Sequence, residues 1–305
     1  MIRNRGVHFQ AVSEIAPFGI VVPTFNAENT LQILITSVRR QTYGGSSPMV
    51  IADQKSTDRT AEIARSNGCT VIAIPRPDPF IAWVTPPFPA EGRNLGAKSI
   101  SGRILLHLDQ DMELASPDFL EKLESVIDTE HQAVVIREVD IAAGFWSRCK
   151  AVERSCLYGT RLEGARAVTR DLFERVGGYD QDVSSGEDVF VTRLYELETQ
   201  IIRDDSLALL HHTGRHSLMW MLRKKFLYGR SAKTYLRKAG SVRGPSASNY
   251  VWSSLGAYLR NWRLLVKHPV LYVCIFPLRA MEFAALRLGM WYGPRVSIAH
   301  AERPA

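Results

Sequence analysis

Short apolar runs alternate with segments of helical periodicity along the first half of the chain. The runs Phe18–Pro23, Met49–Ala52 and Thr70–Ile74 are rich in β-branched residues and bounded by proline or polar residues, a pattern that predicts buried strands. Between them, residues 26–41 and 57–68 carry apolar side chains at helical spacing. Strands that alternate with helices across short loops predict a parallel sheet with helices on both faces.

The alternation continues to residue 136. Residues 91–102 predict a helix, Arg103–Leu108 a strand, 118–130 a further helix and 133–136 a further strand. Ser56 or Thr57 is placed to cap the second helix of the chain. The proline-rich segment between Pro75 and Pro89 fits neither a helix nor a central strand, so it predicts a loop.

Polar and acidic residues gather where these strands end. The buried run Leu105–Leu108 leads directly into Asp109 and Asp111, two like charges one residue apart. An isolated pair of this kind is equally compatible with a solvated turn and with a bound cation. Ligands of open parallel sheets bind at the carboxyl ends of strands, so we expect one shared crevice. The other strand ends supply it with Pro23, Thr24, Phe25, Asn26, Glu28 and Asp53.

Composition narrows the class of protein. A hydrophobic content of 46% over 305 residues suffices for a full core without disulfides, and the four cysteines show no metal-binding spacing. The N-terminus lacks the apolar core of a signal peptide, so we expect a reducing, cytoplasmic location. The net charge of +7 is concentrated in residues 215–243. A basic nucleic-acid-binding protein would fit the charge, but an acidic crevice repels phosphates.

Two common nucleotide-binding motifs are absent. No G-x-G-x-x-G loop follows the first strand, and no G-x-x-x-x-G-K-[ST] segment occurs in the chain. A nucleotidyltransferase would need a glycine-rich phosphate loop at that position, which reads PTFNAEN instead. What remains is a nucleotide site built from carboxylates and a divalent metal, Mn²⁺ or Mg²⁺, which also binds diphosphate oxygens.

Five motifs in order support a specific resemblance. PTFN, DQKSTDRT, EGRNLGA, LDQDM and GGYDQDVSSGEDVF together resemble the inverting family 2 glycosyltransferases of the GT-A fold, over about residues 17 to 240. The resemblance implies an α/β nucleotide-diphospho-sugar transferase with a Rossmann-like, mostly parallel sheet. It also implies a glycosyltransferase activity that uses a UDP-, GDP- or dTDP-sugar. A catalytically degenerate subunit that only binds the nucleotide sugar is the alternative.

The resemblance also assigns roles to individual residues. Asp53 would hold the nucleotide base in a pocket lined by Pro23–Asn26 and Glu28, while Asp109 and the adjacent Gln110 would lie near the ribose. Arg93 and Asn94 would face the nucleotide and its diphosphate. Many relatives have a glycine where this chain has Lys55, which leaves the choice of donor open.

The resemblance further places the metal and the catalytic base. Asp111 would be one metal ligand, and a histidine after the last strand would be another; His211 is favoured because it follows the apolar run ALL, with His212 and His216 as alternatives. In an inverting transfer a general base removes the proton of the acceptor hydroxyl. That base would be Asp188, and Glu187 would position the acceptor. An ordinary helix N-terminus is the competing interpretation of this acidic pair.

The C-terminal third differs from the rest of the chain. We expect a catalytic domain over residues 1–240 and a helical, amphipathic region over 241–305. Its basic and aromatic residues suit an anionic membrane surface. The longest uncharged run, Pro269–Leu278, is short for a membrane span. We therefore expect peripheral or monotopic attachment at the inner face of the cell membrane and a lipid-linked or polysaccharide acceptor, with packing onto the core as the alternative.

Overall fold

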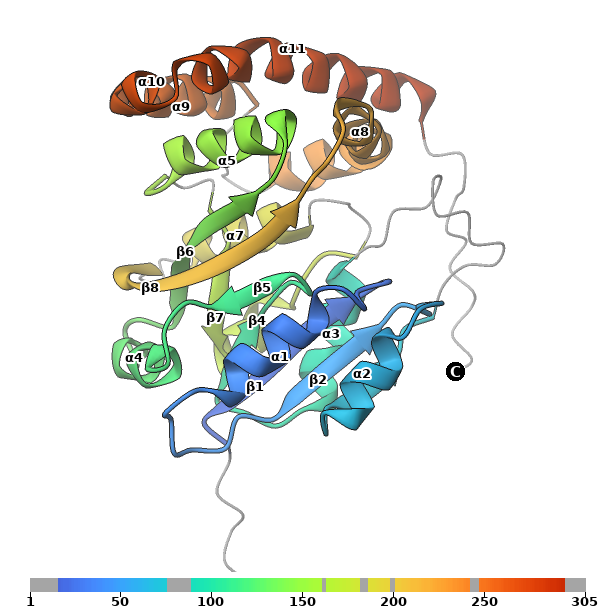
Figure 1. Ribbon diagram of the computed structural model, residues 1–305, viewed down its shortest axis with the longest axis vertical. Coiled ribbons are helices and arrows are strands. Elements are labelled where there is room, and N and C mark those ends of the chain that lie inside the picture. The colour runs from blue at the N-terminus through green and yellow to red at the C-terminus, as the bar shows by residue number, and fades with distance from the viewer. Residues whose placement is uncertain are drawn as a thin grey trace, which may run out of the picture.

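The computed structural model describes residues 16–75, 89–160, 163–181, 186–197, 201–241 and 247–293. Over these residues an eight-stranded sheet, in the order β3-β2-β1-β4-β7-β6-β8-β5, passes through the middle of the molecule (Figure 1). The predicted proline-rich loop lies almost entirely outside the described residues. The strands are β1 (Phe18–Thr24), β2 (Met49–Asp53), β3 (Thr70–Ala73), β4 (Ile104–His107), β5 (Met112–Leu114), β6 (Ala133–Ala142), β7 (Ala165–Thr169) and β8 (Ile201–Gly214).

The first half of the sheet is parallel, as predicted. β1 pairs in parallel with β2 and β4, and β2 pairs in parallel with β3. The register sets Thr24 opposite Asp53, so the polar ends of β1 and β2 lie side by side. The predicted α/β fold with a mostly parallel sheet is confirmed, and its strand ends meet at one edge.

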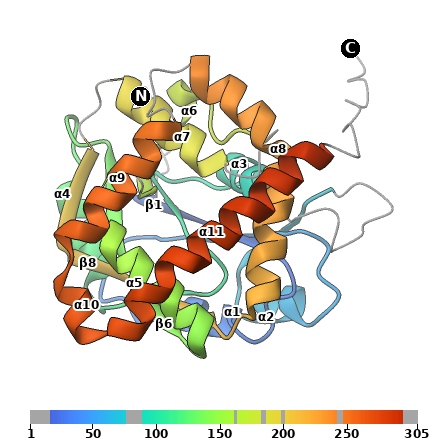
Figure 2. The same cartoon turned by 90° about the horizontal axis from the view of Figure 1, so that it is seen from above.

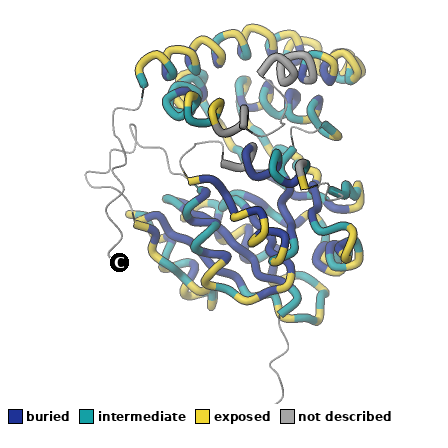
Figure 3. Tube along the Cα trace, turned by 180° about the vertical axis from the view of Figure 1, so that it is seen from behind, coloured by how far each residue is buried: buried dark blue, intermediate teal, exposed yellow. Residues whose placement is uncertain are grey.

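Helices cover both faces of this sheet. Apolar side chains of the first set pack on one face with those of β1, and the second set packs on the other face with those of β4 and β7. Figure 3 shows the buried strands between these layers. The first set is α1 (Leu31–Arg39), α2 (Thr60–Ser66) and α4 (Phe119–Val126); the second is α3 (Pro89–Ser99), α6 (Arg170–Val176) and α7 (Gly186–Glu196).

Two glycines let α3 lie unusually close to the sheet. A Cβ atom on Gly96 would lie 2.5 Å from Val21 Cγ1, and one on Gly92 would lie 3.2 Å from Pro23 Cβ. A side chain at either position would push the helix outward. The glycines of the EGRNLGA motif therefore bring Arg93, which lies between them, next to the ends of the strands.

The second half of the sheet is mixed. β7 is antiparallel to β4 and β6, β8 is parallel to β6, and the short β5 is antiparallel to β8. The sequence did not predict β5 or β7, and β8 extends to Gly214 rather than ending before His211. His211 is therefore a residue within a strand, and its neighbour in β6 fixes its position.

A helical layer lies over the end of the sheet formed by β6 and β8 (Figure 1). Seen from above, α11 crosses over both α5 and α8 (Figure 2). A Cβ on Gly229 would lie 2.1 Å from the Leu286 carbonyl oxygen, so α8 and α11 touch backbone to backbone. The division after residue 240 stays a prediction. The layer contains α5 (Phe145–Leu157), α8 (Leu218–Ser241), α9 (Ala247–Arg260), α10 (Arg263–Lys267) and α11 (Pro269–Tyr292).

Candidate active site

Asp53, at the end of β2, organises the first turn of the site. Its Oδ1 accepts hydrogen bonds from Thr24 Oγ1 at 3.2 Å and from Ser56 Oγ at 2.5 Å, and its Oδ2 accepts one from the Ser56 backbone N–H at 3.1 Å. The carboxylate is 7% exposed. The predicted capping role of Ser56 or Thr57 is wrong, because α2 begins only at Thr60. Ser56 instead fixes the orientation of Asp53.

The residues after β1 are tied to two other strand ends. The Phe25 backbone N–H donates to Gln110 Oε1 at 2.7 Å, and Gln110 Nε2 donates to the Phe25 carbonyl at 3.3 Å. Asn26 Oδ1 accepts from the Thr57 N–H at 2.9 Å, and Glu28 Oε2 accepts from the Arg59 N–H at 3.3 Å. The turns after β1, β2 and β4 therefore form one connected edge, as the sequence predicted.

Lys55 stands in the left-handed region of the backbone, with φ of +56°. Side chains with a Cβ rarely adopt this conformation, which glycine adopts without strain. The glycine that many relatives carry at this position therefore suits the shape of the turn, and Lys55 keeps the same shape with some strain.

The two aspartates that follow β4 have different cationic partners. Asp109 lies between two arginines, with Arg93 Nη2 at 2.5 Å from Oδ1 and Arg166 Nη2 at 2.9 Å from Oδ2. Burial alone would raise the pKa of Asp109, but Arg166 and Arg93 hold it far below its usual range. Asp109 is therefore ionised at neutral pH, and its charge is already paired without a metal.

Asp111 faces a histidine. Its Oδ1 lies 3.2 Å from His211 Nε2, and 29% of its side chain is exposed. Behind the imidazole, Nδ1 lies 3.4 Å from Glu138 Oε2 and 2.6 Å from Arg154 Nη1. Burial lowers the pKa of His211, but hydrogen bonds to Asp111 and Glu138 outweigh it and raise the pKa to about 9.

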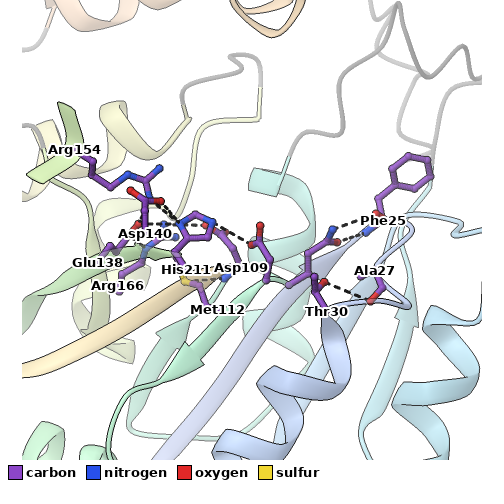
Figure 4. A network of polar contacts seen from close by, with 12 residues as sticks. Phe25, Ala27, Thr30, Asp109, Met112, Glu138, Asp140, Arg154, Arg166 and His211 are labelled. Atoms are coloured by element: carbon purple, nitrogen blue, oxygen red, sulfur yellow. Dashed lines mark hydrogen bonds and ion pairs between the residues drawn. The ribbon is translucent and has the colours of Figure 1, made fainter. Parts of the chain in front are cut away.

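A chain of charges that the sequence analysis missed links these two aspartates (Figure 4). Arg166 Nε donates to Glu138 Oε1 at 2.8 Å while its Nη2 holds Asp109, and Arg154 contacts both Glu138 at 2.8 Å and Asp140 at 3.2 Å. The sequence contains a signal for this chain of charges. Glu138 and Asp140 follow the predicted strand 133–136 at alternate positions, which places them on one face if the strand continues, as it does in β6. Only the pairing of β6 with β8 brings that face to His211.

The other two candidate histidines have different neighbours. His212 Nε2 lies 2.7 Å from Glu113 Oε2, because successive side chains of β8 point to opposite faces. The ring of His216 stacks on Trp220 with centroids 3.7 Å apart. Among the three histidines, His211 is the one beside Asp111; its role as a metal ligand stays a prediction.

Asn94 connects the site to the GGYD segment. Its Nδ2 donates to the Tyr179 carbonyl at 2.8 Å, and its Oδ1 accepts from the Tyr179 N–H at 2.9 Å. Glu187 and Asp188 lie in the first turn of α7, but their side chains fall outside the described residues, as do the residues just before that helix. Their catalytic roles therefore stay predictions.

In the described part of the chain, no group of three or more His, Cys, Asp or Glu side chains is arranged to hold a metal ion. Asp111 and His211 are a two-residue pair, one carboxylate oxygen and one imidazole nitrogen, open to solvent on one side. Such a pair fits a divalent cation whose other ligands come from water or a substrate.

The fold and site are those of the GT-A class of transferase folds. The sheet is half parallel, two aspartates follow its fourth strand, and three strand ends build one polar edge. The chain belongs to the family described as Glycosyl transferase family 2, whose model matches residues 19–227. The resemblance inferred from the five motifs is thereby confirmed, and the protein is an enzyme of the glycosyltransferase class.

Relatives and solved structures agree with this assignment. The chain is 25% identical to the succinoglycan biosynthesis protein ExoA of Rhizobium meliloti (strain 1021), over 92% of this chain and 89% of that protein. It is similar in fold to the mannosyltransferase PcManGT from Pyrobaculum calidifontis, in complex with GDP-Man and Mn²⁺, with a TM-score of 0.62, 15% identity and coverage of 92% and 89%. It also resembles TarS 1-349 of S. aureus in complex with UDP-GlcNAc, with a TM-score of 0.50, 15% identity and 90% coverage of each chain.

Proposed function

We propose that the protein is an inverting glycosyltransferase that moves a sugar from a nucleotide-diphosphate sugar to a hydroxyl acceptor. The observation that carries this proposal is the connected edge formed by Asp53, Gln110 and Asp111 at the ends of β2 and β4. It combines a buried acceptor of hydrogen bonds, Asp53, with a carboxylate–imidazole pair, Asp111 and His211, that is open to solvent at the carboxylate. A nucleotide sugar with its base at Asp53 and its diphosphate at the Asp111–His211 pair would span this edge.

The donor pocket follows from these contacts. Asp53 would accept hydrogen bonds from the base, and the turn from Pro23 to Asn26 with Glu28 would line the pocket. Arg93 and Arg166 hold Asp109 as an anion, so that its oxygens stay fixed beside the ribose position. GDP-Man and UDP-GlcNAc are bound in the solved structures of PcManGT and TarS. We expect a UDP-, GDP- or dTDP-sugar here.

Asp111 and His211 would hold a divalent cation, Mn²⁺ or Mg²⁺. When bound, the cation stabilises the charge that builds up on the departing diphosphate. Proton donation from Nδ1 to Glu138 would leave the Nε2 lone pair facing Asp111, which is the arrangement that metal-bound histidines adopt. This tautomer requires Arg154 Nη1, now 2.6 Å from Nδ1, to move away, because two donors cannot face each other at that distance. Mn²⁺ is present in the PcManGT structure.

Asp188 would act as the general base and Glu187 would position the acceptor. A carboxylate in the first turn of a helix is favoured by the free N–H groups there, which keeps it ionised and able to accept a proton. Transfer in a single displacement then needs only this base and a stabilised leaving group.

A two-stage experiment tests the proposal. Thermal-shift measurements with UDP-, GDP- and dTDP-sugars, with and without Mn²⁺, identify the donor, because a ligand that binds only the folded state stabilises it by about 2.7 kcal/mol at 100 times its Kd. The Asp188→Asn variant should then lose transfer and keep the thermal shift, with Glu187→Gln as a milder control. Full turnover by Asp188→Asn would remove Asp188 from the mechanism, and no shift with any nucleotide sugar would contradict the donor assignment.

The helical layer supports a location at the membrane surface. Among the described residues, one helix, α11, is long and apolar enough to cross a membrane. Two of its three charged residues, however, face the protein: Glu282 Oε2 lies 3.1 Å from Lys150 Nζ of α5, and Arg279 contacts both Glu153 and Glu282. Breaking these buried ion pairs would be costly. We infer that α11 lies in the membrane plane, on top of the catalytic domain.

The outer face of α9, α10 and α11 has the composition of an interfacial surface. Its exposed apolar residues include Trp291 at 82%, Val266 at 71% and Leu259 at 68% exposure (Figure 3). Residues 254–293 contain one acidic residue, the buried Glu282, whereas the cations Arg260, Arg263, Lys267 and Arg287 are exposed. Apolar residues with cations between them suit the headgroup region of an anionic bilayer. A lipid-linked acceptor would be concentrated there.

Liposome flotation tests the attachment. The full chain should float with phosphatidylglycerol vesicles and less with phosphatidylcholine vesicles. Arg263→Glu with Lys267→Glu should abolish flotation, while Arg65→Glu on the exposed side of α2 should not. Extraction by alkaline carbonate should release the protein; resistance to carbonate would indicate a spanning helix, and a concentration-dependent dimer without flotation would indicate that a second copy covers this face.

A further inference from the structure

An open cavity of about 460 Å³ lies where the sheet joins the helical layer. It is formed by the first residues of α5 and by the connection between β8 and α8, with Phe145, Trp146, Arg215, His216 and Leu218 among its lining residues. Its volume falls within the range of small-molecule sites. Apart from His216, which the sequence offered as an alternative metal ligand, none of these residues has a role assigned above.

The cavity adjoins the Asp111–His211 pair. Asp140 pairs with His211 and Ala142 with Gly214 in the β6–β8 ladder, so both walls of the cavity begin where this ladder ends. Arg215 is four residues beyond His211, or about 13 Å along an extended chain. The charges of Asp111 and His211 act on the pKa of His216, which burial lowers first. A molecule in the cavity would therefore lie beside a sugar donor held at that pair.

One part of the lining favours an anion. The Arg215 guanidinium forms no hydrogen bond or ion pair with any residue in the described ranges, although its aliphatic part packs 3.0 Å from the Cβ position of Gly144. Lys224 lies near the same opening, with its Nζ 5.2 Å from the Trp220 ring centroid. The helices α5 and α8 both begin here, so their positive dipole ends add to the potential, although Ser217 Oγ accepts a hydrogen bond from the Trp220 N–H of α8.

The rest of the lining is apolar and leads toward α11. The Phe145 and Trp146 rings meet edge to face with centroids 5.0 Å apart, and Phe145 is 43% exposed. Trp146 and Leu218 pack against a buried cluster that includes Leu278 of α11. The cavity thus has a cationic side near the sheet and an aromatic side beneath the helix that we place at the membrane surface.

We propose that this cavity binds the acceptor, and that the acceptor carries a phosphate group next to an apolar chain. Arg215 binds the phosphate as a two-pronged donor, and Phe145 and Trp146 contact the chain where it leaves toward the bilayer. The inference rests on the proposed glycosyl transfer, since it identifies the class of acceptor for that reaction.

Calorimetric titration of the full chain in mild detergent tests this site, with farnesyl phosphate, farnesol and glycerol 3-phosphate as probes. Farnesyl phosphate should bind at least tenfold more tightly than the other two. Arg215→Ala should weaken farnesyl phosphate binding roughly tenfold to hundredfold, the range expected for loss of a charged hydrogen bond. Arg65→Ala on α2 is the matched control and should change nothing.

Several outcomes would overturn the inference. Equal binding of glycerol 3-phosphate and farnesyl phosphate would show that the phosphate bound here belongs to a soluble molecule and not to a lipid. Unchanged binding by Arg215→Ala would remove the cavity as the site. Weaker nucleotide-sugar binding by Arg215→Ala would assign the arginine to the donor instead. Because these titrations need no turnover, they remain informative even if glycosyl transfer is not observed.

Discussion

The molecule contains two clusters of buried charge that differ in how they meet solvent. In the helical layer, Glu153 and Glu282 are 2% and 3% exposed and are met by Lys150 and Arg279. At the active site, four carboxylates meet three arginines and one histidine. In the first cluster both carboxylates are buried behind cations, and it is closed in this sense. The second is open at Asp111, whose side chain is 29% exposed, and it gains an excess negative charge when His211 is neutral, as a metal ligand must be.

This difference separates a structural role from a functional one. A closed cluster fixes one helix against another, and any missing partner leaves an unpaired buried charge. The open cluster would be completed by the divalent cation proposed above, which would take the place of the proton on His211. The same types of residue thus stabilise the fold in one place and create a binding site in the other.

The largest effect is expected from removing the open carboxylate. Asp111→Asn should lower kcat by about a thousandfold or more, because the cation contributes several kcal/mol of transition-state stabilisation. The fold should be unaffected, since the side chain is partly exposed. Activity measured across a Mn²⁺ titration, with the melting temperature as control, checks this; normal activity at saturating Mg²⁺ or Mn²⁺ would contradict it.

Breaking the closed cluster should act on stability instead. Glu282→Ala should lower the free energy of unfolding by about 3–5 kcal/mol, because Lys150 and Arg279 lose a buried partner. Replacing Lys150 and Glu282 together by methionine should recover most of that loss. Urea denaturation of the wild type, the single variant and the double variant measures the free energy of unfolding. A Glu282→Ala variant as stable as the wild type would show that the cluster does not hold α11 in place.

The open cluster should give the metal-free protein a distinctive pH dependence. The pKa of His211 is raised to about 9 in the folded state from an ordinary 6.5, so its contribution is complete below pH 6.5 and is lost as the pH rises through about 9. That contribution amounts to about 3 kcal/mol. Stability measured in chelator from pH 6 to 10 should fall more steeply for wild type than for His211→Gln; equal slopes would contradict it.

A smaller effect is expected from the residue that holds His211. Glu138→Gln should weaken Mn²⁺ affinity about tenfold to a hundredfold, the usual effect of removing the carboxylate behind a metal-bound histidine. Electron paramagnetic resonance of Mn²⁺ binding checks this without turnover. The conservative variant Glu138→Asp should recover part of the affinity, and unchanged affinity in Glu138→Gln would limit Glu138 to a structural role.

The smallest effect concerns the turn that follows β2, where Lys55 adopts a left-handed backbone conformation. Lys55→Gly should raise stability by about 1 kcal/mol, because glycine adopts the left-handed conformation without strain. Donor affinity should change little if Lys55 only shapes the turn. Thermal melts with and without nucleotide sugar separate the two effects, and a large loss of affinity would assign the ammonium group to the donor.

The sequence predicted those features that depend on residues close to one another along the chain. The strands β1 to β4 and their polar ends follow from local apolar runs, and the sharing of one edge follows from parallel pairing. Asp53 and Gln110 accordingly lie on one connected edge, while their roles toward a nucleotide stay predictions. The resemblance to the family placed His211, and the structure sets it beside Asp111.

What the sequence did not reveal depends on long-range pairing. β7 contains Arg166 within a five-residue strand, and β5 has only three residues, so neither shows a clear period of two. Glu138, Arg154 and Arg166 become part of the site only because β6 lies between β7 and β8. The interior partners of α11 likewise belong to α5, more than a hundred residues away.

The short connections between the sheet and the helical layer have a geometric consequence. β8 ends at Gly214 and α8 begins at Leu218, while β6 ends at Ala142 and α5 begins at Phe145. Both joints are short, so a layer attached to the bilayer as proposed would act as a spacer of fixed height between the bilayer and His211. A lipid-linked acceptor would then be selected by how far its hydroxyl projects from the lipid, because a saccharide one unit too short or too long would miss the donor sugar.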